Sequence, residues 1–426
     1  MGVGVTAVAG VGSVSGGIVT ECRSCGSSAL TEVLDLGSTP IANALVDPAD
    51  SRVAPEYPLG ISFCADCALV QLRYALPAEA IFDADYPYYS SFSDALCDHA
   101  ARHVEGLLTS RSLDGTHFAV EVASNDGYLL RNFVAAGVPV LGIDPSPGPA
   151  QAAEAIGVPT LVDFFGVDVA RRIRDEHGLA DVIVANNVMA HVPDLNDLVG
   201  GFAALLADDG VLTVENPWVR DLVEHVEFDT IYHEHFCYFS CSSVDNLMRR
   251  HGLHLNDVEY FPDLHGGTLR WSIGHHDERT ERCATFLADE RRSGLTGRDY
   301  YTQFADRVDE CQRALRALVR DLRDQGRTIA AYGAAAKGAT LLNSTGIGAD
   351  DIAFVVDRNV HKQGKSMPGC GLPIRPVEAL LEDAPDDLLL LAWNFADEIV
   401  RQQREFADRG GRFYVPVPMP REITAG

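Results

Sequence analysis

The sequence predicts an α/β protein with two successive sets of βαβ units and a small cysteine-containing module ahead of them. Short apolar strands alternate with helical segments twice along the chain, which is typical of parallel sheets covered by helices. Two Cys-x-x-Cys pairs precede the first set and indicate a compact module held by a metal. The 426 residues suffice for roughly two to four domains. We expect a flexible leader, a zinc module and two α/β domains, at residues 1–19, 20–85, 86–275 and 276–426.

The composition is ordinary for a globular protein, with 46% hydrophobic and 22% charged residues. The net charge of −27 opposes binding to bulk nucleic acid and to anionic membranes, so we expect a small-molecule partner. No window approaches 18 uninterrupted apolar residues, and residues 1–19 lack the basic start of a secretory signal. The ten cysteines are not arranged as a secreted disulfide framework. We expect a cytoplasmic protein that is a monomer and needs neither nucleic acid nor membrane.

The first motif is Cys22-x-x-Cys25 followed by Cys64-x-x-Cys67. Each pair places two thiolates on a tight turn, and two such turns complete a tetrahedral sulfur site that suits Zn²⁺. Four thiolates leave no open coordination position, so the metal would be structural. The alternative is four unrelated core thiols, which the spacing disfavours. Four prolines predict little regular structure in this module: Pro40, Pro48, Pro55 and Pro58.

An aromatic stretch follows, reading Asp-Tyr-Pro-Tyr-Tyr-Ser-Ser-Phe and containing Tyr86 and Tyr88. Two interpretations stay open for it. It is either a packed linker or a lip over a site, with one hydroxyl pointing inward. From Ser93 to about Ser110 the pattern becomes helical.

The organising stretch of the first α/β domain is Val120–Leu130, which predicts a buried strand, a tight turn and a helix. Glu121 lies in the strand, and residues 124–127 form the turn, where Gly127 allows close approach of a ligand. A second apolar strand ends in Asp144, at the spacing where a carboxylate binds a ribose diol. The Gly-x-Gly-x-x-Gly fingerprint is missing. The turn resembles the first motif of class I S-adenosylmethionine (SAM) methyltransferases, and the alternative is an ordinary strand-to-helix turn.

Four strands of this domain are predicted from apolar runs, and their carboxyl ends should line one edge of a parallel sheet. They are Phe118–Val122, Val140–Ile143, Val182–Ala185 and Val211–Glu215. Asn186 and Asn187 follow the third strand, and Asn216 follows the fourth. His191 comes shortly after the asparagine pair, and on its own it could equally be a loop histidine bonded to backbone.

The densest group of titratable residues is Tyr-His-Glu-His, residues 232–235. A histidine is suited to proton transfer near neutral pH, and a neighbouring carboxylate can set its tautomer. The pattern lacks the His-Glu-x-x-His spacing of zinc proteases. A polar strand edge is the structural alternative.

The last part of the chain predicts a long amphipathic helix and a second βαβ set. Apolar residues recur at steps of three and four between Phe304 and Leu322. The second set has strands at 328–332, 352–356, 388–392 and 412–415. Its Gly-Ala-Ala-Ala-Lys-Gly turn, which contains Lys337, is not a Walker A loop. It could cradle a diphosphate at a helix N-terminus, or the lobe could serve packing only.

Taken together, these motifs resemble the sugar C-methyltransferase family, SAM-dependent enzymes of antibiotic pathways that act on nucleotide-linked keto-deoxysugars. The resemblance covers nearly all of the chain after the leader and implies a class I methyltransferase-like Rossmann core, an N-terminal zinc module and a second Rossmann-like domain. It implies structural zinc at Cys22, Cys25, Cys64 and Cys67. It implies an active site drawn from Tyr86, His191, Tyr232, Glu234 and His235. We expect SAM at Glu121, Ala123, Ser124, Asn125, Gly127, Asp144, Asn186 and Asn187. We expect the nucleotide sugar at Tyr88 and Lys337.

The resulting hypothesis is methyl transfer from SAM to C3 of a thymidine-diphosphate 4-keto-deoxysugar. The proton beside the ketone leaves first, with His235 as the base and Glu234 orienting it. The enolate oxygen takes hydrogen bonds from Tyr86, His191 or Tyr232. Two rivals are a methyltransferase whose zinc module reads RNA or protein, and a nicotinamide-dependent sugar oxidoreductase. The charge of −27 disfavours RNA, and the missing glycine fingerprint disfavours a nicotinamide cofactor.

Overall fold

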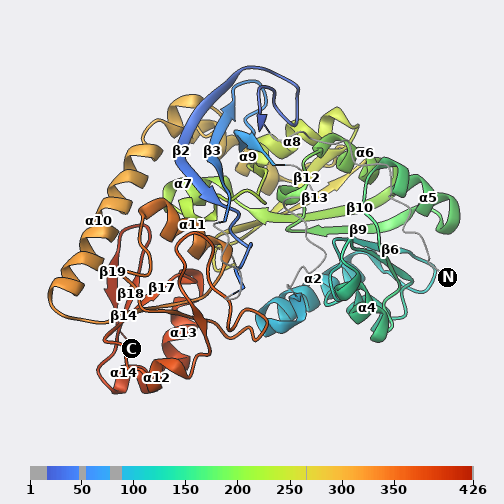
Figure 1. Cartoon of the computed structure of the whole chain (residues 1–426). Coiled ribbons are helices and arrows are strands. Elements are labelled where there is room, and N and C mark those ends of the chain that lie inside the picture. The colour runs from blue at the N-terminus through green and yellow to red at the C-terminus, as the bar shows by residue number, and fades with distance from the viewer. Residues whose placement is uncertain (1–16, 48–53, 77–88, 265, 425–426) are drawn as a thin grey trace, which may run out of the picture.

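The computed structural model describes residues 17–47, 54–76, 89–264 and 266–424 (Figure 1). They form a four-stranded, a seven-stranded and a six-stranded sheet, together with one two-stranded ribbon. The four-stranded sheet is built mainly from the N-terminal part of the chain and lies beside the seven-stranded sheet. The six-stranded sheet forms the C-terminal lobe. None of the helices in these described ranges is both long enough and apolar enough to cross a membrane.

The N-terminal module contains an antiparallel sheet in the order β11-β4-β3-β2. Its strands are β2 (Leu30–Pro40), β3 (Glu56–Cys64), β4 (Val70–Leu72) and β11 (Cys237–Tyr238), and the ribbon pairs β1 (Gly17–Ile18) with β5 (Tyr74–Ala75). The prediction of little regular structure was therefore wrong. Pro40 ends the edge strand β2, and Pro58 pairs with Ser38 beside a register shift, positions where a missing N–H costs little. Ordered structure also begins before residue 20, because Gly17 and Ile18 pair with β5.

The central sheet has the order β12-β13-β10-β9-β6-β7-β8. Its strands are β6 (Ala119–Val122), β7 (Val140–Ile143), β8 (Thr160–Leu161), β9 (Ala180–Asn186), β10 (Leu206–Pro217), β12 (His254–Phe261) and β13 (Thr268–Gly274). The five strands from β10 to β8 are parallel, which confirms the parallel arrangement predicted for β6, β7, β9 and β10 and adds β8 to it. The edge hairpin β12–β13 runs antiparallel and was not predicted. The chain order reverses between β6 and β9, and ligands of such sheets bind beyond the carboxyl ends at this point.

Helices cover both faces of the central sheet. Val182 and Val184 of β9 face the side of α2 and α3, whereas Ile183 and Ala185 face the side of α5 and α6. The helical segments of this part of the chain are η1 (Ser90–Phe92), α2 (Asp94–Arg111), α3 (Leu130–Ala135), α4 (Pro147–Ala155), α5 (Val167–His177), η2 (Met189–His191), α6 (Leu195–Leu205), α7 (Val219–Glu224), η3 (Phe228–Thr230), α8 (Cys241–Arg250) and α9 (Glu281–Ser293). Alternate residues of β9 thus support two separate packing layers.

The C-terminal lobe has the sheet order β16-β15-β14-β17-β18-β19, parallel except for the last strand. Its strands are β14 (Ile329–Tyr332), β15 (Val355–Val356), β16 (Ile374–Arg375), β17 (Asp387–Leu390), β18 (Arg412–Val415) and β19 (Arg421–Ile423). Its helical segments are η4 (Arg298–Tyr301), α10 (Phe304–Asp324), α11 (Ala336–Thr345), α12 (Ala379–Glu382), η5 (Trp393–Phe395), α13 (Ala396–Gln402) and α14 (Arg404–Asp408). The second βαβ set is therefore confirmed as a separate sheet.

The three parts of the chain are joined by contacts as well as by covalent links. Strand β11 lies in the chain between β10 and β12 of the central sheet, yet it pairs with β4 of the N-terminal module. The long helix α10 contacts β2, α11 and β14, as expected of a helix that packs across lobes. In Figure 1 it runs along the outer left side of the molecule. Helix α11 packs against η3, which immediately precedes the Tyr-His-Glu-His segment.

Candidate active site

The four predicted metal ligands lie together. The Sγ atoms of Cys22 and Cys67 are 3.5 Å apart, as are those of Cys25 and Cys64, and all four lie within 4.8 Å of one another. Tetrahedral Zn²⁺ with Zn–S bonds of about 2.3 Å places sulfurs about 3.8 Å apart, so the cluster fits the metal. Each turn continues with a residue of positive φ, Gly26 at 71° and Ala68 at 60°. These backbone conformations help to bring the two thiols of each pair to one side of the turn.

The predicted cofactor turn connects β6 to α3. Three of its residues have positive φ: Ala123 at 58°, Asn125 at 51° and Gly127 at 77°. Asp144 fixes this conformation, because its carboxylate accepts hydrogen bonds from the backbone N–H groups of Asn125 and Ser146, each at 2.9 Å. Asp144 thus lies at the turn, as the sequence predicted, and it also supports the backbone there.

Packing around the cofactor turn also requires a glycine at position 127. A Cβ atom there would meet side-chain atoms of Val158 and Ala153 at 3.1 and 3.2 Å. The positive φ and this close packing against the region of α4 account for the glycine without a ligand.

The cofactor turn carries a concentration of buried acidic groups. Burial raises the pKa of Glu121 well above its usual value, and the neighbouring Asp144 and Asp126 raise it further. Burial also raises the pKa of Asp144. Four buried polar atoms of this region have no hydrogen-bond partner among the described residues: Glu121 Oε2, Ser124 Oγ, Asp126 Oδ1 and Asn186 Oδ1. A cationic ligand that also offers hydroxyl and amino groups satisfies this set, and SAM, with its sulfonium and ammonium groups, has that chemistry.

Neighbouring segments complete this edge of the sheet. The N–H of Ser90 donates to Asn125 Oδ1 at 2.8 Å, and that of Ser91 donates to Asp126 Oδ2 at 3.2 Å. The end of the aromatic stretch therefore contacts the cofactor turn, whereas Tyr86 and Tyr88 lie outside the described residues. Asn187, the other predicted contact, has a φ of 54° and donates its N–H to the carbonyl of Glu215 at 2.7 Å.

Among the described residues, both ring nitrogens of His235 lie at hydrogen-bond distance from a partner. Its Nδ1 lies 3.0 Å from the carbonyl oxygen of Thr230, which can only accept, so Nδ1 carries a proton. In the neutral ring Nε2 is then the basic atom, and it accepts a hydrogen bond from the Tyr232 hydroxyl at 2.7 Å. The local backbone therefore selects one tautomer and points the lone pair of His235 at a phenol.

His191 lies directly against this pair. The rings of His191 and His235 are 4.7 Å apart at 65°. A backbone hydrogen bond from Phe236 to the carbonyl of Ala190, at 2.7 Å, ties the two segments together. Burial lowers the pKa of His191 to about 4, so its ring is neutral at pH 7. Because η2 follows β9, this cluster belongs to the same sheet edge as the cofactor turn.

The expected pairing of Glu234 with His235 was wrong. Glu234 Oε1 accepts hydrogen bonds from the backbone N–H and the Nδ2 of Asn43, at 3.3 and 3.1 Å. Its other oxygen is buried without a partner in the described chain, and burial raises the pKa of this carboxyl group. The segment is a turn at His233 and Glu234, closed by a hydrogen bond of 2.9 Å from the His235 N–H to the Tyr232 carbonyl, and this turn directs the two neighbouring side chains to different partners. Glu234 instead attaches the segment to the N-terminal module.

Lys337 lies where the C-terminal lobe meets η3. Its Nζ donates to Asn394 Oδ1 at 2.9 Å and sits 4.4 Å from the centre of the Trp393 ring. Burial lowers the pKa of Lys337, while Asp229 and Glu227 oppose that shift. The lysine therefore borders η3 from the second lobe, shortly before the Tyr-His-Glu-His segment in the chain.

Sequence reasoning gave no role to two buried residues near this edge. Asn216 is 1% exposed, and neither polar atom of its amide has a hydrogen-bond partner in the described chain. Asp229 is fully buried and bonds Trp393 of the other lobe. The position of Asn216 at a strand end was the available signal, whereas no local pattern distinguishes Asp229.

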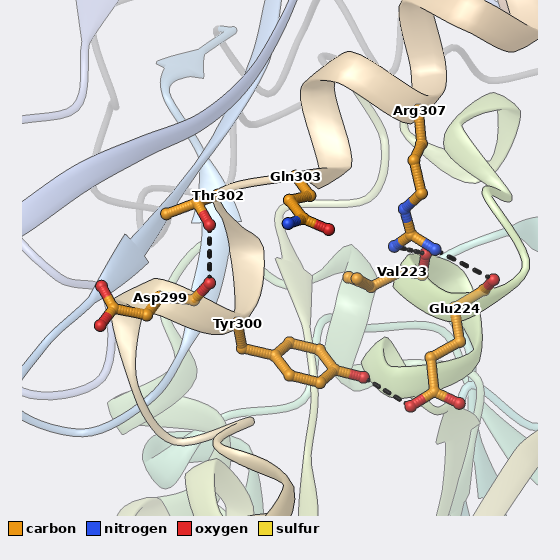
Figure 2. Close-up of a pocket in the computed structure, with 7 residues that line it drawn as sticks. All are labelled: Val223, Glu224, Asp299, Tyr300, Thr302, Gln303 and Arg307. Carbon is orange, nitrogen blue, oxygen red and sulfur yellow. Dashed lines mark hydrogen bonds between the residues drawn. The ribbon is translucent and has the colours of Figure 1, made fainter.

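A hollow of about 360 Å³ lies elsewhere, at the junction of α7, η4 and α10 (Figure 2). Its lining residues are Val223, Glu224, Asp299, Tyr300, Thr302, Gln303 and Arg307. Its polar groups largely satisfy one another: Tyr300 Oη donates to Glu224 Oε1 at 2.8 Å, and Arg307 donates to the Val223 carbonyl at 2.6 Å. No predicted site residue lines it, and it offers no catalytic group arrangement.

Comparison with known proteins identifies the family of this chain. Family profiles match a "Putative zinc binding domain" at residues 22–82, a methyltransferase domain at 116–258 and a C-methyltransferase C-terminal domain at 263–418. The C-methyltransferase NovU of Streptomyces niveus is 38% identical over 412 residues, which cover 96% of this chain and 97% of NovU. This chain belongs to the same C-methyltransferase family. The enzyme is SAM-dependent and its N-terminal module is a zinc-binding domain.

Solved structures give weaker matches to the enzyme. Magnesium protoporphyrin IX methyltransferase from Synechocystis, with bound SAM, covers 42% of this chain and 78% of its own, at 14% identity and a TM-score of 0.33. A TehB-like SAM-dependent methyltransferase from Corynebacterium glutamicum covers 43% and 99%, at 15% identity and a TM-score of 0.31. Scores this low carry no argument about the enzyme.

Proposed function

We propose that this C-methyltransferase methylates C3 of a thymidine-diphosphate 4-keto-deoxysugar through an enolate, in the biosynthesis of an antibiotic deoxysugar. The observation that carries the proposal is the fixed tautomer of His235, whose basic Nε2 faces Tyr232 beside a neutral His191. Carbon is a weak nucleophile until a proton leaves it, and a histidine of defined tautomer is suited to that step.

Proton removal can follow either of two balanced routes from this arrangement. In the first route the substrate takes the place of the Tyr232 hydroxyl beside His235, and the substrate carbon gives its proton directly to His235 Nε2. Alternatively, Tyr232 gives its own proton to Nε2 while its oxygen takes the proton from carbon. In both routes the imidazolium is stabilised by the Nδ1–H bond to the Thr230 carbonyl.

The developing charge on the sugar's keto oxygen needs hydrogen-bond donors. We assign this role to His191, Tyr232 and Tyr86. His191 is neutral at pH 7, so it donates from an N–H without carrying a charge into the buried site. Donors fixed in place before reaction contribute more than mobile water would.

We assign the methyl donor to the cofactor turn, with Glu121, Asp126 and Asp144 as the acidic groups that receive it. SAM supplies an electrophilic methyl group on a sulfonium. The chain supplies the binding groups already described, and Asn186 and Asn187 border them from the end of β9. Binding at this edge places donor and His235 cluster on one side of the sheet.

We assign the nucleotide of the substrate to the C-terminal lobe. Its first turn repeats the geometry of the cofactor turn: Asp357 Oδ2 accepts from Ala334 N at 2.8 Å, as Asp144 Oδ2 does from Asn125 N at 2.9 Å. The N-terminus of α11 and Lys337 supply positive potential for a diphosphate. Tyr88 is assigned to the same substrate.

The substrate assignment is tested by incubating the enzyme and SAM with a panel of nucleotide sugars. The panel varies the nucleoside, the position of the keto group and the substituent at C3. We expect a mass gain of one methyl group for thymidine-diphosphate 4-keto sugars, located at C3 by NMR. Methylation of RNA or protein, but of no sugar, would refute the assignment. The same preparation should elute as a monomer. It should also contain no disulfide bonds, because we propose a cytoplasmic enzyme.

Replacing Asp144 with Ala should weaken SAM binding. A hydrogen bond to a charged group is worth about 1.5–3 kcal/mol, which corresponds to a loss of roughly 10- to 150-fold in affinity. Isothermal titration calorimetry measures this directly. Asp357→Ala is the matched control, because it removes the equivalent carboxylate from the other lobe. Equal SAM affinity in Asp144→Ala and the wild type would show that the cofactor does not bind at this turn.

A further inference from the structure

Asp229 forms a link between two lobes. It lies in η3 and is fully buried, and its Oδ2 accepts a hydrogen bond of 2.6 Å from Nε1 of Trp393 in the C-terminal lobe. Lys337 covers the Trp393 ring and bonds the adjacent Asn394. The Asp229 carboxylate is thus hydrogen-bonded to Trp393 of η5, and Lys337 of α11 covers that ring and bonds the next residue of η5.

Such a carboxylate is costly unless its neighbours compensate for its burial. Transfer of an unpaired ionised carboxylate from water to a protein interior costs several kcal/mol or more. Here burial raises the pKa of Asp229 to about 6, while Lys337 and the bond from Trp393 oppose the rise. An apolar residue would fill the same place at lower cost, so the polar link calls for a role other than packing.

The residue after Asp229 provides that role. The Thr230 carbonyl is the group that accepts the hydrogen bond from His235 Nδ1. Its position is set by a rigid turn, in which the N–H and the hydroxyl of Thr230 donate to the Glu227 carbonyl at 3.1 and 2.7 Å. Ile231 N–H donates to the Phe228 carbonyl at 3.1 Å and closes the turn. The side chain of Asp229 attaches this turn to the C-terminal lobe.

We propose that Asp229 is a positioning residue: through Trp393 it seats the Thr230 carbonyl, which holds His235 in the tautomer with a basic Nε2. This proposal rests on the proposed role of His235 as the base. The lobe assigned to the nucleotide thereby contributes to proton removal without touching the reacting carbon. Contact between the lobes at Trp393 prepares the base, and loss of that contact leaves the base free to change tautomer.

The test uses full-length Trp393→Phe, which loses the N–H but keeps an aromatic ring beside Lys337. Turnover should fall roughly 10- to 100-fold, the range expected for loss of a hydrogen bond to a charged group, while SAM affinity stays unchanged. The ¹⁵N spectrum of histidine-labelled, substrate-free enzyme should show His235 with a single protonated Nδ1 in the wild type and a tautomer mixture in Trp393→Phe. His235→Asn assigns the signal by its disappearance.

Three further variants separate positioning from general damage. Trp218→Phe removes a comparable bond, from Nε1 to Glu290 at 2.9 Å, and should leave the His235 tautomer unchanged. Asp229→Asn keeps an oxygen acceptor for Trp393 and should retain the wild-type tautomer, whereas Asp229→Leu should not. An unchanged tautomer in both Trp393→Phe and Asp229→Leu would overturn the proposal. The spectrum is recorded without turnover, so this outcome is distinct from failure of His235 as the base, which proton exchange in His235→Asn decides.

Discussion

Replacing His235 with Asn is expected to lower turnover by roughly 10²–10⁴, the usual worth of a positioned acid or base. Asparagine keeps a polar group of similar size but cannot take up a proton. The cofactor turn and the C-terminal lobe do not include this side chain, so SAM and nucleotide sugar should bind almost normally. Steady-state kinetics together with calorimetry for each ligand measure the two quantities separately.

Exchange of the C3 proton with solvent deuterium isolates the first chemical step. With the demethylated product in place of SAM, exchange should also slow in His235→Asn, because it needs the base but no methyl group. His233→Asn is the control: the neighbouring His233 lies near the Pro58 carbonyl, at 3.3 Å, and its variant should exchange far faster than His235→Asn. Exchange at the wild-type rate in His235→Asn would place the base elsewhere, with His191 as the next candidate.

Removing zinc is the second change with a large expected effect. Cys64→Ser should lower metal content and stability together, since zinc binding to thiolates contributes about 10–16 kcal/mol to the folding of zinc-finger peptides at pH 7. Activity should fall as well, because the module directly supports the catalytic segment. Asn43 bonds Glu234, and Leu72 N–H donates to the Phe236 carbonyl at 2.9 Å.

Metal analysis and thermal unfolding of the same samples test this expectation. Cys283→Ser is the matched control, because Cys283 is equally buried but lies outside the four-cysteine cluster. It should keep its zinc and lose little stability. If chelation of all zinc left both fold and activity intact, the structural role of the metal would be refuted.

The sequence by itself determined four strands in each of the two α/β sheets and the four residues of the metal cluster. Apolar runs marked β6, β7, β9 and β10, because a strand buried on both faces is apolar along most of its length. The Cys-x-x-Cys turns are local, so their spacing alone predicted the ligands. These features depend on interactions between residues near one another in the chain.

Only the tertiary structure decided the partners of the polar side chains and the arrangement of the edges. Glu234 pairs with Asn43, 191 residues away, rather than with the adjacent His235. Asp229 meets Trp393 across 164 residues, and β11 completes a sheet begun by β4. A buried polar group bonds whatever the packing of distant segments brings within about 3 Å, and no local periodicity carries that information. The orientation of His235 likewise became visible only in the structure, where the Thr230 carbonyl accepts a hydrogen bond from its Nδ1.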